Sequence, residues 1–428
     1  MAAATTIVNA RVFDGAAPRD WTSVRFAGGV ITGCSATPAV MDGDEVIDAA
    51  GGTVLPGLID THVHLVAGAL ARSLTFGVTT VLDMFSEPGV VAAARGQAGS
   101  RPDVADVRSS GVGATAPGGH PSMLYDPFPT LTSAEQAPRF VDDRIAEGCD
   151  YLKVFSGPGG LWPSLDAGTV TALVAAAHTR GLVVVAHVSS TAGLRQVVSA
   201  GVDVVAHVPT DADLDDALVA RVAEAGIAVG PTLATVENTL GGAGGAAVLG
   251  DPRLAGALGD VWVRRLTSDA PVPPGRHLPP YSRAEDNVRR LADAGVTLLA
   301  GTDAPNPGTV FGASLHRELE LLVRCGLGPA RALAAATTAP ARVFGLTDRG
   351  RVAPGQRADL VLVSGDPLTD ITATRGIERI WRAGIPCDRN AFVAGAAETA
   401  QLDAFDARIA AVVAAVRARR PGPRNDVS

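Results

Sequence analysis

The chain has 428 residues, of which 47% are hydrophobic and 19% charged, a composition that excludes an intrinsically disordered protein and allows a large core. Its net charge of −8 and sequence pI near 5.5 argue against a nucleic-acid-binding surface, which needs a basic face. No apolar run reaches membrane-spanning length, and residues 1–8 lack the pattern of a signal peptide, so we expect no membrane partner. Four scattered cysteines without Cys-x-x-Cys spacing are typical of a cytoplasmic protein.

The first 54 residues contain short strand patterns separated by glycine, proline and aspartate, as residues 346–395 do again. Between them, residues 55–345 alternate apolar strands with helix-patterned segments, which is typical of a parallel sheet. The strand candidates of this middle part are 58–64, 78–84, 104–111, 151–155, 182–187, 202–207, 227–232 and 296–303. The predicted fold class is therefore α/β, a (β/α)8 TIM barrel with a small composite β-sandwich domain built from both termini.

Two further segments lie outside this regular pattern. Residues 233–290 are long for a connection and include a glycine-rich run at 241–245, so we predict a lid with one helix at 282–294. Residues 396–428 are predicted to form a C-terminal helix and tail. Aromatic and basic residues are few on its apolar side, so we expect it to dock on the protein rather than on a membrane.

Two histidines, His62 and His64, end the first barrel strand. Side chains at i and i+2 of a strand point to the same side, so the two imidazoles converge, as a Zn²⁺ site requires. Alone, such a pair is as easily two ordinary strand histidines. Applied to the other strand ends, the same reasoning adds His187, His207 and Asp303. Because a barrel gathers the carboxyl ends of its strands, these side chains predict a divalent metal site.

Lys153 lies inside an apolar strand, where an ammonium ion is costly to bury. It could be an ion-paired or snorkelling lysine. Alternatively, burial depresses its pKa, and the neutral amine reacts with CO₂ to form a carbamate, an anionic ligand able to bridge two metals. In that arrangement the carbamate and a water span two metal ions, held by His62, His64 and Asp303 on one side and His187 and His207 on the other.

These residues belong to a set of motifs that resembles the metal-dependent amidohydrolase superfamily. The set comprises residues 56–64, Lys153, His187, His207, 301–304, 315–322, 332–341, 350–359 and 365–368. It extends over nearly the whole chain and is most similar to the imidazolonepropionase-like and Xaa-Pro-dipeptidase-like branch. The resemblance implies a carboxylated lysine between two zinc ions, in a barrel flanked by a composite β-sandwich.

Gly118-Gly119-His120 also resembles a feature of that branch, in which a histidine contacts the substrate near the scissile carbonyl. Pro121 stands where the family pattern has glycine, and a loop histidine often has no such role. Further candidates for substrate binding, which could equally pack on the surface, are Tyr125, Trp162 and Tyr281. We assign no metal to the remaining histidines, which are His178, His277 and His316.

The predicted reaction is hydrolysis of an amide-type C–N bond by a metal-bridging hydroxide, with an N-acyl amino acid, a dipeptide or a cyclic amide as substrate. Asp303 would transfer the proton to the leaving nitrogen, and His120 would stabilise the oxyanion. Lactone, ester or phosphotriester hydrolysis is open to the same site. A mononuclear deaminase fits less well, because such relatives carry a glutamate where Ser190 stands, and a non-catalytic scaffold would have lost ligands. Homo-oligomers are an open expectation, since such barrels are often dimers or larger.

Overall fold

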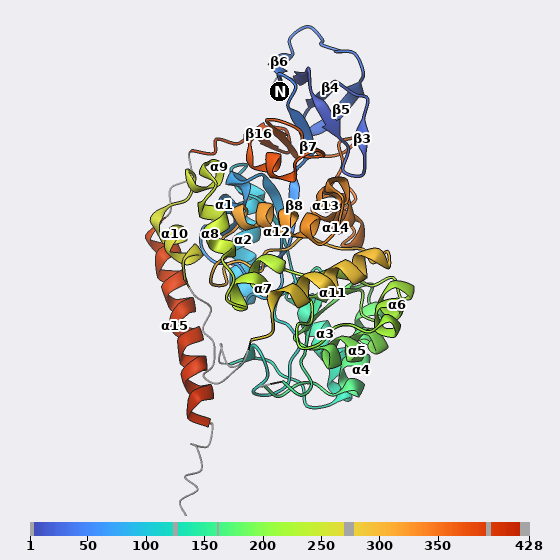
Figure 1. Ribbon diagram of the computed structural model, residues 1–428, viewed down its shortest axis with the longest axis vertical. Helices are drawn as coiled ribbons and strands as arrows, with labels where there is room; N and C mark the ends of the chain where they lie inside the picture. The colour runs from blue at the N-terminus through green and yellow to red at the C-terminus, as the bar shows by residue number, and fades with distance from the viewer. Residues whose placement is uncertain (1–3, 123–126, 161, 269–277, 391–394, 420–428) are drawn as a thin grey trace, which may run out of the picture.

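The computed structural model describes residues 4–122, 127–160, 162–268, 278–390 and 395–419. A small β-rich lobe occupies one end of the molecule, and a larger α/β part lies below it in Figure 1. One sheet of the lobe has the order β5–β4–β1–β6 and the other β17–β16–β15–β7–β2–β3. Their bounds are β1 Thr5–Val8, β2 Arg11–Phe13, β3 Pro18–Arg19, β4 Ser23–Ala27, β5 Val30–Ser35, β6 Glu45–Asp48, β7 Thr53–Pro56, β15 Leu360–Val363, β16 Ile377–Arg382 and β17 Ile385–Pro386.

The second sheet contains strands from both ends of the chain, because β7 pairs antiparallel with β15, with Leu55 opposite Val361. Apolar side chains of the two sheets meet in a separate core, in which the Phe26 and Trp381 rings pack edge to face with centroids 5.6 Å apart. The prediction that both termini build one small β unit is therefore confirmed for the strand pairing. The boundaries assigned to the domains stay a prediction.

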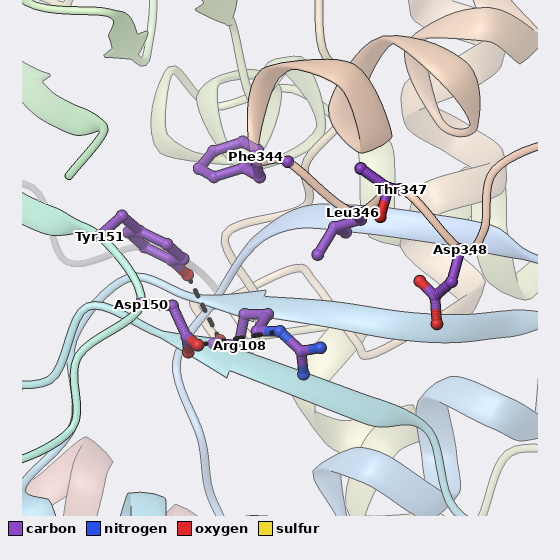
Figure 2. Close-up of a pocket in the computed structure, with 8 residues that line it drawn as sticks. Arg108, Asp150, Tyr151, Phe344, Leu346, Thr347 and Asp348 are labelled. Atoms are coloured by element: carbon purple, nitrogen blue, oxygen red, sulfur yellow. Dashed lines mark hydrogen bonds and ion pairs between the residues drawn. The ribbon is translucent and has the colours of Figure 1, made fainter. Parts of the chain in front are cut away.

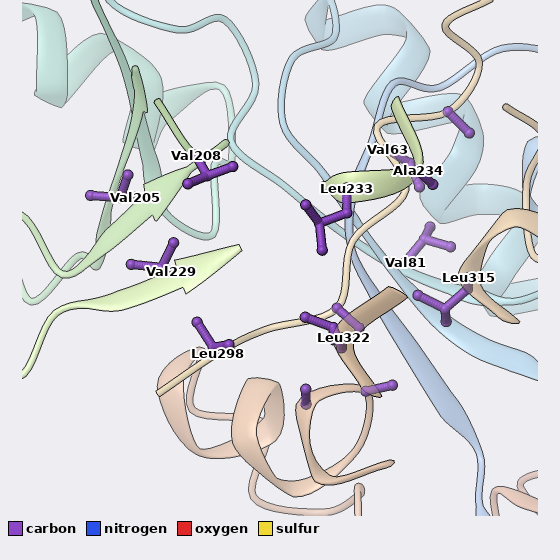
Figure 3. Packing of buried hydrophobic residues seen from close by; sticks show 14 of the residues in the cluster. Val63, Val81, Val205, Val208, Val229, Leu233, Ala234, Leu298, Leu315 and Leu322 are labelled. Atoms are coloured by element: carbon purple, nitrogen blue, oxygen red, sulfur yellow. The ribbon is translucent and has the colours of Figure 1, made fainter. Parts of the chain in front are cut away.

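The larger part is built on parallel strands, as predicted. They form two sheets of order β10–β9–β8 and β11–β12–β13–β14. Their bounds are β8 Leu58–Val63, β9 Val78–Asp83, β10 Asp106–Ser109, β11 Leu152–Ser156, β12 Val184–Val188, β13 Val204–Ala206 and β14 Ala228–Gly230. Outward residues such as Val205, Val229 and Leu298 pack side by side under the helices, as Figure 3 shows. Their sequence neighbours Val204, Ala228 and Leu299 belong to a different cluster of buried residues, as the alternation of a strand requires.

The predicted eighth strand, 296–303, is not a regular strand, so the expected continuous barrel sheet is incomplete. Single parallel bridges join Val229 to Leu298, Val63 to Ala304 and, between the two sheets, Ala114 to Val154. The interruption has a local cause, because the Asp60 carboxylate accepts hydrogen bonds from the backbone N–H groups of His62 and Thr302. The Asp60 side chain thus accepts backbone N–H groups that a regular pairing of parallel strands would use.

Helices follow the parallel strands and cover them. Three of them begin at side chains that accept a backbone N–H of the first turn, namely Asp166, Ser190 and Asp215. The helices of this layer are α1 Ala69–Thr75, α2 Pro88–Ser100, α3 Ala137–Ala146, α4 Ala167–Thr179, α5 Thr191–Ala200, α6 Asp216–Glu224, α11 Tyr281–Asp293, α12 Ala313–Arg324, α13 Pro329–Ala335 and α14 Thr338–Val343. Within the described ranges, no helix is long and apolar enough to cross a membrane.

The insertion predicted as a lid contains four short helices rather than open loop. They are α7 Leu233–Thr239, α8 Gly244–Leu249, α9 Pro252–Ala255 and α10 Asp260–Leu266. The glycine run serves close packing here, since a Cβ on Gly245 would lie 1.9 Å from the Leu266 carbonyl oxygen. Residues 269–277 of the insertion lie outside the described residues.

The last helix, α15 (Ala396–Arg419), runs along one side of the molecule (Figure 1). Its first turns dock as predicted: Leu402 is 2% exposed in the main core, and Glu398 accepts a hydrogen bond from the Trp262 indole of α10. Gln401 accepts a hydrogen bond from the backbone N–H of Ala67, three residues after His64.

We expect Leu402→Ala to lower the free energy of unfolding by about 2–4 kcal/mol, because it removes buried methyl groups and leaves a cavity. The exposed neighbour provides the control, since Asp403→Ala should stay within about 0.5 kcal/mol of the parent protein. Urea unfolding followed by circular dichroism measures both. Equal losses in the two variants would contradict the docking of this helix.

Candidate metal centre

Side chains from three strand ends meet at one point. His62, His207 and Asp303 each offer a ligand atom, and these atoms lie within 4.8 Å of one another. Oδ1 of Asp303 is 3.0 Å from Nε2 of His64 and 3.4 Å from Nε2 of His62. Two imidazoles and a carboxylate at such distances are the donor types that Zn²⁺ binds. The predicted convergence of these strand ends is therefore seen in the structure.

His187 and His120 extend this group, so that four histidine rings lie in a row with His62 and His207. Ring centroids are 4.9 Å apart for His62 and His207, 4.6 Å for His207 and His187, and 5.2 Å for His187 and His120. The row therefore runs from the end of β8 to the loop after β10. His120 also packs against the Phe155 ring at 5.4 Å. Which of these side chains would bind which of two metals stays a prediction.

Lys153 of β11 lies beside this row. Its side chain is fully buried, and its Nζ atom has no hydrogen-bond partner among the described residues. Burial lowers the pKa of this amine from 10.5 to about 7, against the opposing charges of Asp303 and Asp83. Lysine and arginine together number 36 in the chain, and Lys153 is the only lysine among them.

The protonation states suit a metal site. Burial, followed by the charge of Lys153, holds the pKa of His62 well below its usual range. Burial likewise lowers the pKa of His120 and of His207 to about 4. Burial alone would raise the pKa of Asp303, but the His64 hydrogen bond and the nearby cationic groups outweigh it and lower the pKa. Neutral imidazoles and an ionised carboxylate are the forms that bind a cation.

Two buried carboxylates behind the metal centre were not assigned a role from the sequence. Besides the backbone bonds described above, Asp60 accepts a hydrogen bond from the Thr302 hydroxyl at 2.7 Å. Asp83 ends β9 and accepts hydrogen bonds from the hydroxyl groups of Ser86 and Ser109 and from the backbone N–H of Leu65. Asp83 could have been found by the strand-end reasoning that identified Asp303.

The backbone is strained at this place as well. His207, Thr232 and Asp303, which follow three neighbouring strand positions, have φ values of 73°, 51° and 55°. Residues other than glycine rarely adopt such left-handed values, and three of the six that do so in the described residues gather here, the others being Asn9, Ala50 and Ala383 of the β-rich lobe. The Thr232 hydroxyl lies 2.7 Å from Nδ1 of His207. Nothing in the sequence singled out Thr232.

Other predicted residues lie elsewhere. His316 is buried between the Phe76 carbonyl and the Thr374 hydroxyl, at 3.0 Å from each, and His178 contacts Asp203 at 2.9 Å. Both thus make contacts away from the row of histidine rings, and the prediction that neither binds a metal stays a prediction. Tyr281 packs against the main core with Glu237 and Glu318 nearby, and Trp162 is partly exposed. Their role in substrate binding stays a prediction, and Tyr125 and His277 lie outside the described residues.

A hollow away from the histidine row lies at the start of β11 (Figure 2). Its lining includes the Tyr151 hydroxyl, which donates to the Asp83 carbonyl at 2.8 Å and approaches the Arg108 carbonyl at 3.3 Å. The other lining residues are Asp150, Phe344, Gly345, Leu346, Thr347 and Asp348. None of these is a predicted site residue, so the histidine row is the better candidate for chemistry.

The chain is similar to known proteins over most of its length. A family model described as the amidohydrolase family matches residues 53–385. Imidazolonepropionase of Salinispora arenicola is 27% identical over 385 residues, which cover 81% of this chain and 84% of that protein. The enzyme of that name from Deinococcus deserti is 44% identical, but over 100 residues only, 22% of this chain and 25% of its own length. A solved Xaa-Pro dipeptidase with methionine bound in its active site has the same fold, with a TM-score of 0.70 at 22% identity, covering 90% of this chain and all of its own.

Proposed function

From the premise that this chain belongs to the amidohydrolase family, enzymes that act on carbon–nitrogen bonds, we propose that it is a binuclear metal-dependent hydrolase of an amide-type C–N bond. The proposed metal ions are two divalent cations, best Zn²⁺. The proposed ligands are His62, His64, His187, His207, Asp303 and a carbamate on Lys153. The proposed scaffold is a TIM barrel like those of its relatives.

The observation that carries this proposal is the environment of Lys153. A fully buried amine without a hydrogen-bond partner is costly to keep as an ammonium ion. An arginine at this position could not form a carbamate, because its guanidinium stays charged. Its pKa of about 7 leaves a large share of neutral amine, the form that adds CO₂. Beside it, His62, His207 and Asp303 could hold one zinc ion, and we assign His64, His187 and a Lys153 carbamate to complete a pair. The residues present thus suit the metal pair that the family implies.

When bound, two such cations lower the pKa of a shared water and polarise the scissile carbonyl. The side chains of the chain supply the remaining chemistry. Asp303, ionised and within 3.0 Å of His64, accepts a proton from the attacking water and delivers it to the leaving nitrogen. His120, neutral because its pKa is about 4, donates an N–H to the developing oxyanion.

The substrate class that we propose is an N-acyl amino acid, a dipeptide or a cyclic amide. The relatives named above act on such bonds according to their names, since one is an imidazolonepropionase and another a Xaa-Pro dipeptidase. A screen should include lactones and phosphotriesters, because the same metal pair could attack those carbonyl and phosphoryl centres. If the protein hydrolyses lactones or phosphotriesters but none of the amides, the proposed amide substrate class is wrong.

Metal removal tests the proposal directly. We expect about two zinc ions per chain by elemental analysis, loss of hydrolysis after dialysis against a chelator, and recovery when zinc and bicarbonate are returned together. Recovery with zinc alone, in buffer freed of CO₂, should be weaker. Hydrolysis that persists in metal-free protein would overturn the proposed function.

A further inference from the structure

Helix α7 begins directly after β14, and its N-terminus is satisfied in an unusual way. The N-cap residue, Thr232, makes no side-chain hydrogen bond to the helix, although threonine is a favoured cap. Its hydroxyl instead lies 2.7 Å from Nδ1 of His207. The first backbone N–H groups of the helix therefore need another acceptor.

That acceptor comes from a helix far along the chain. Glu318 of α12 is fully buried, and its two carboxylate oxygens accept hydrogen bonds from the N–H groups of Leu233 at 3.0 Å and Ala234 at 2.7 Å. Thr232 has a left-handed backbone rather than the extended one of a capping residue, so its hydroxyl contacts the imidazole while Glu318 accepts from the first N–H groups of α7. The contact with His207 and the two hydrogen bonds to Glu318 are thus made by three consecutive residues, 232–234.

The other side of α7 is bound to the segment that carries Asp303. Thr235 donates a hydrogen bond to the Thr302 carbonyl at 2.8 Å, and Asn238 donates to the Gly308 carbonyl at 2.9 Å. The neighbouring Arg317 of α12 pairs with Glu237 of α7 at 2.8 Å. This short helix is thus bound on two sides, and the residue before it, Thr232, contacts a side chain of the metal centre.

We propose that Glu318 is a positioning residue for the metal centre, which acts through the N-terminus of α7 and the Thr232 hydroxyl to fix the orientation of the His207 ring. This inference rests on the proposed function. Nδ1 of His207 lies 2.7 Å from the Thr232 hydroxyl and 4.0 Å from Oδ2 of Asp303, so the shorter contact engages Nδ1 and leaves Nε2 for a cation. The second contact of a ligating histidine commonly sets the affinity of the site. Glu318 itself touches neither substrate nor metal.

The test measures zinc affinity on metal-stripped protein, by competition with a chromophoric chelator. Thr232→Val keeps the β-branched shape and removes the hydroxyl, and we expect it to weaken the binding of one of two zinc ions by about 10–100-fold. Thr232→Ser keeps the hydroxyl and should therefore keep most of the parental zinc affinity. Glu318→Gln replaces one acceptor oxygen by an N–H donor. It should weaken the binding of the same zinc ion.

The matched control is Glu320→Gln on the same helix, since Glu320 pairs with Arg317 and Arg375 and should affect stability but not zinc affinity. The double variant Thr232→Val/Glu318→Gln should have the same zinc affinity as whichever single variant binds zinc less tightly, because both changes act through one hydroxyl.

Multiplied losses in the double variant, or equal zinc affinities for Glu318→Gln and Glu320→Gln, would overturn the inference. Should Glu318→Gln fail to fold, unchanged zinc binding in Thr232→Val overturns it by itself. A parent protein that binds no metal would instead remove the proposed function, so the two failures are distinguishable.

Discussion

Replacing Lys153 by arginine should lower kcat by roughly 10³-fold or more, because a guanidinium keeps its charge and cannot form the carbamate. In the parent protein, ¹³C-labelled bicarbonate should give one lysine carbamate resonance, since the chain has a single lysine, in addition to any carbamate of the N-terminal amine, which Lys153→Arg retains. The resonance should grow as the pH of metal-free protein rises from about 6 to about 8, because the Lys153 pKa of about 7 is crossed and the ammonium ion loses its proton. Lys153→Arg should show no such signal.

The control for this experiment is Lys153→Ala with added short carboxylates. The truncated side chain leaves room for a free acetate or propionate to stand in for the carbamate, so part of the activity should return with the carboxylate and none with the matching alcohol. If Lys153→Arg kept parental turnover and zinc content, the two-metal assignment would be wrong.

A second large effect is expected at Asp303. Asp303→Asn removes the proton acceptor while keeping an oxygen that can contact a cation, so kcat should fall about 10²–10⁴-fold, whereas zinc content should change far less. Measuring kcat and zinc per chain on the same sample separates the two roles. The loss should appear in kcat rather than in KM, because the proton moves in the transition state.

His178→Gln provides the control for Asp303→Asn. It changes a partly exposed imidazole that pairs with Asp203, away from the metal centre, and should leave both kcat and zinc content unchanged. An Asp303→Asn protein with two zinc ions and parental turnover would show that the proton passes through another group.

Much of the metal centre could be predicted from the sequence, because strand ends in a parallel α/β fold meet at one edge. His62 and Asp303 are far apart in the chain, yet each follows a recognisable apolar strand, and the structure brings them together. What could not be predicted depends on contacts between side chains and distant backbone. The Asp60 carboxylate interrupts the eighth strand, and Glu318 caps a helix that lies 84 residues earlier.

The same distinction explains the insertion. A run such as Gly241–Gly245 resembles a flexible lid in the sequence, because glycine favours open loops. Its actual use, close contact between α8 and α10, becomes visible only when the carbonyl of Leu266 is known to lie against Gly245. Local composition thus predicted the position of a special segment but not its packed helices, and its role as a lid stays a prediction.

The docking of α15 beside the loop that follows His64 has a consequence for biosynthesis. Gln401 holds the backbone of Ala67, and a Cβ on Gly68 would lie 2.9 Å from the Glu398 carboxylate, so the last helix supports a loop near the first histidines. During synthesis, residues 62–68, which carry the two histidines and the supported loop, emerge long before α15 does. We therefore expect proteins shortened before residue 396 to present the histidine pair beside an unsupported loop.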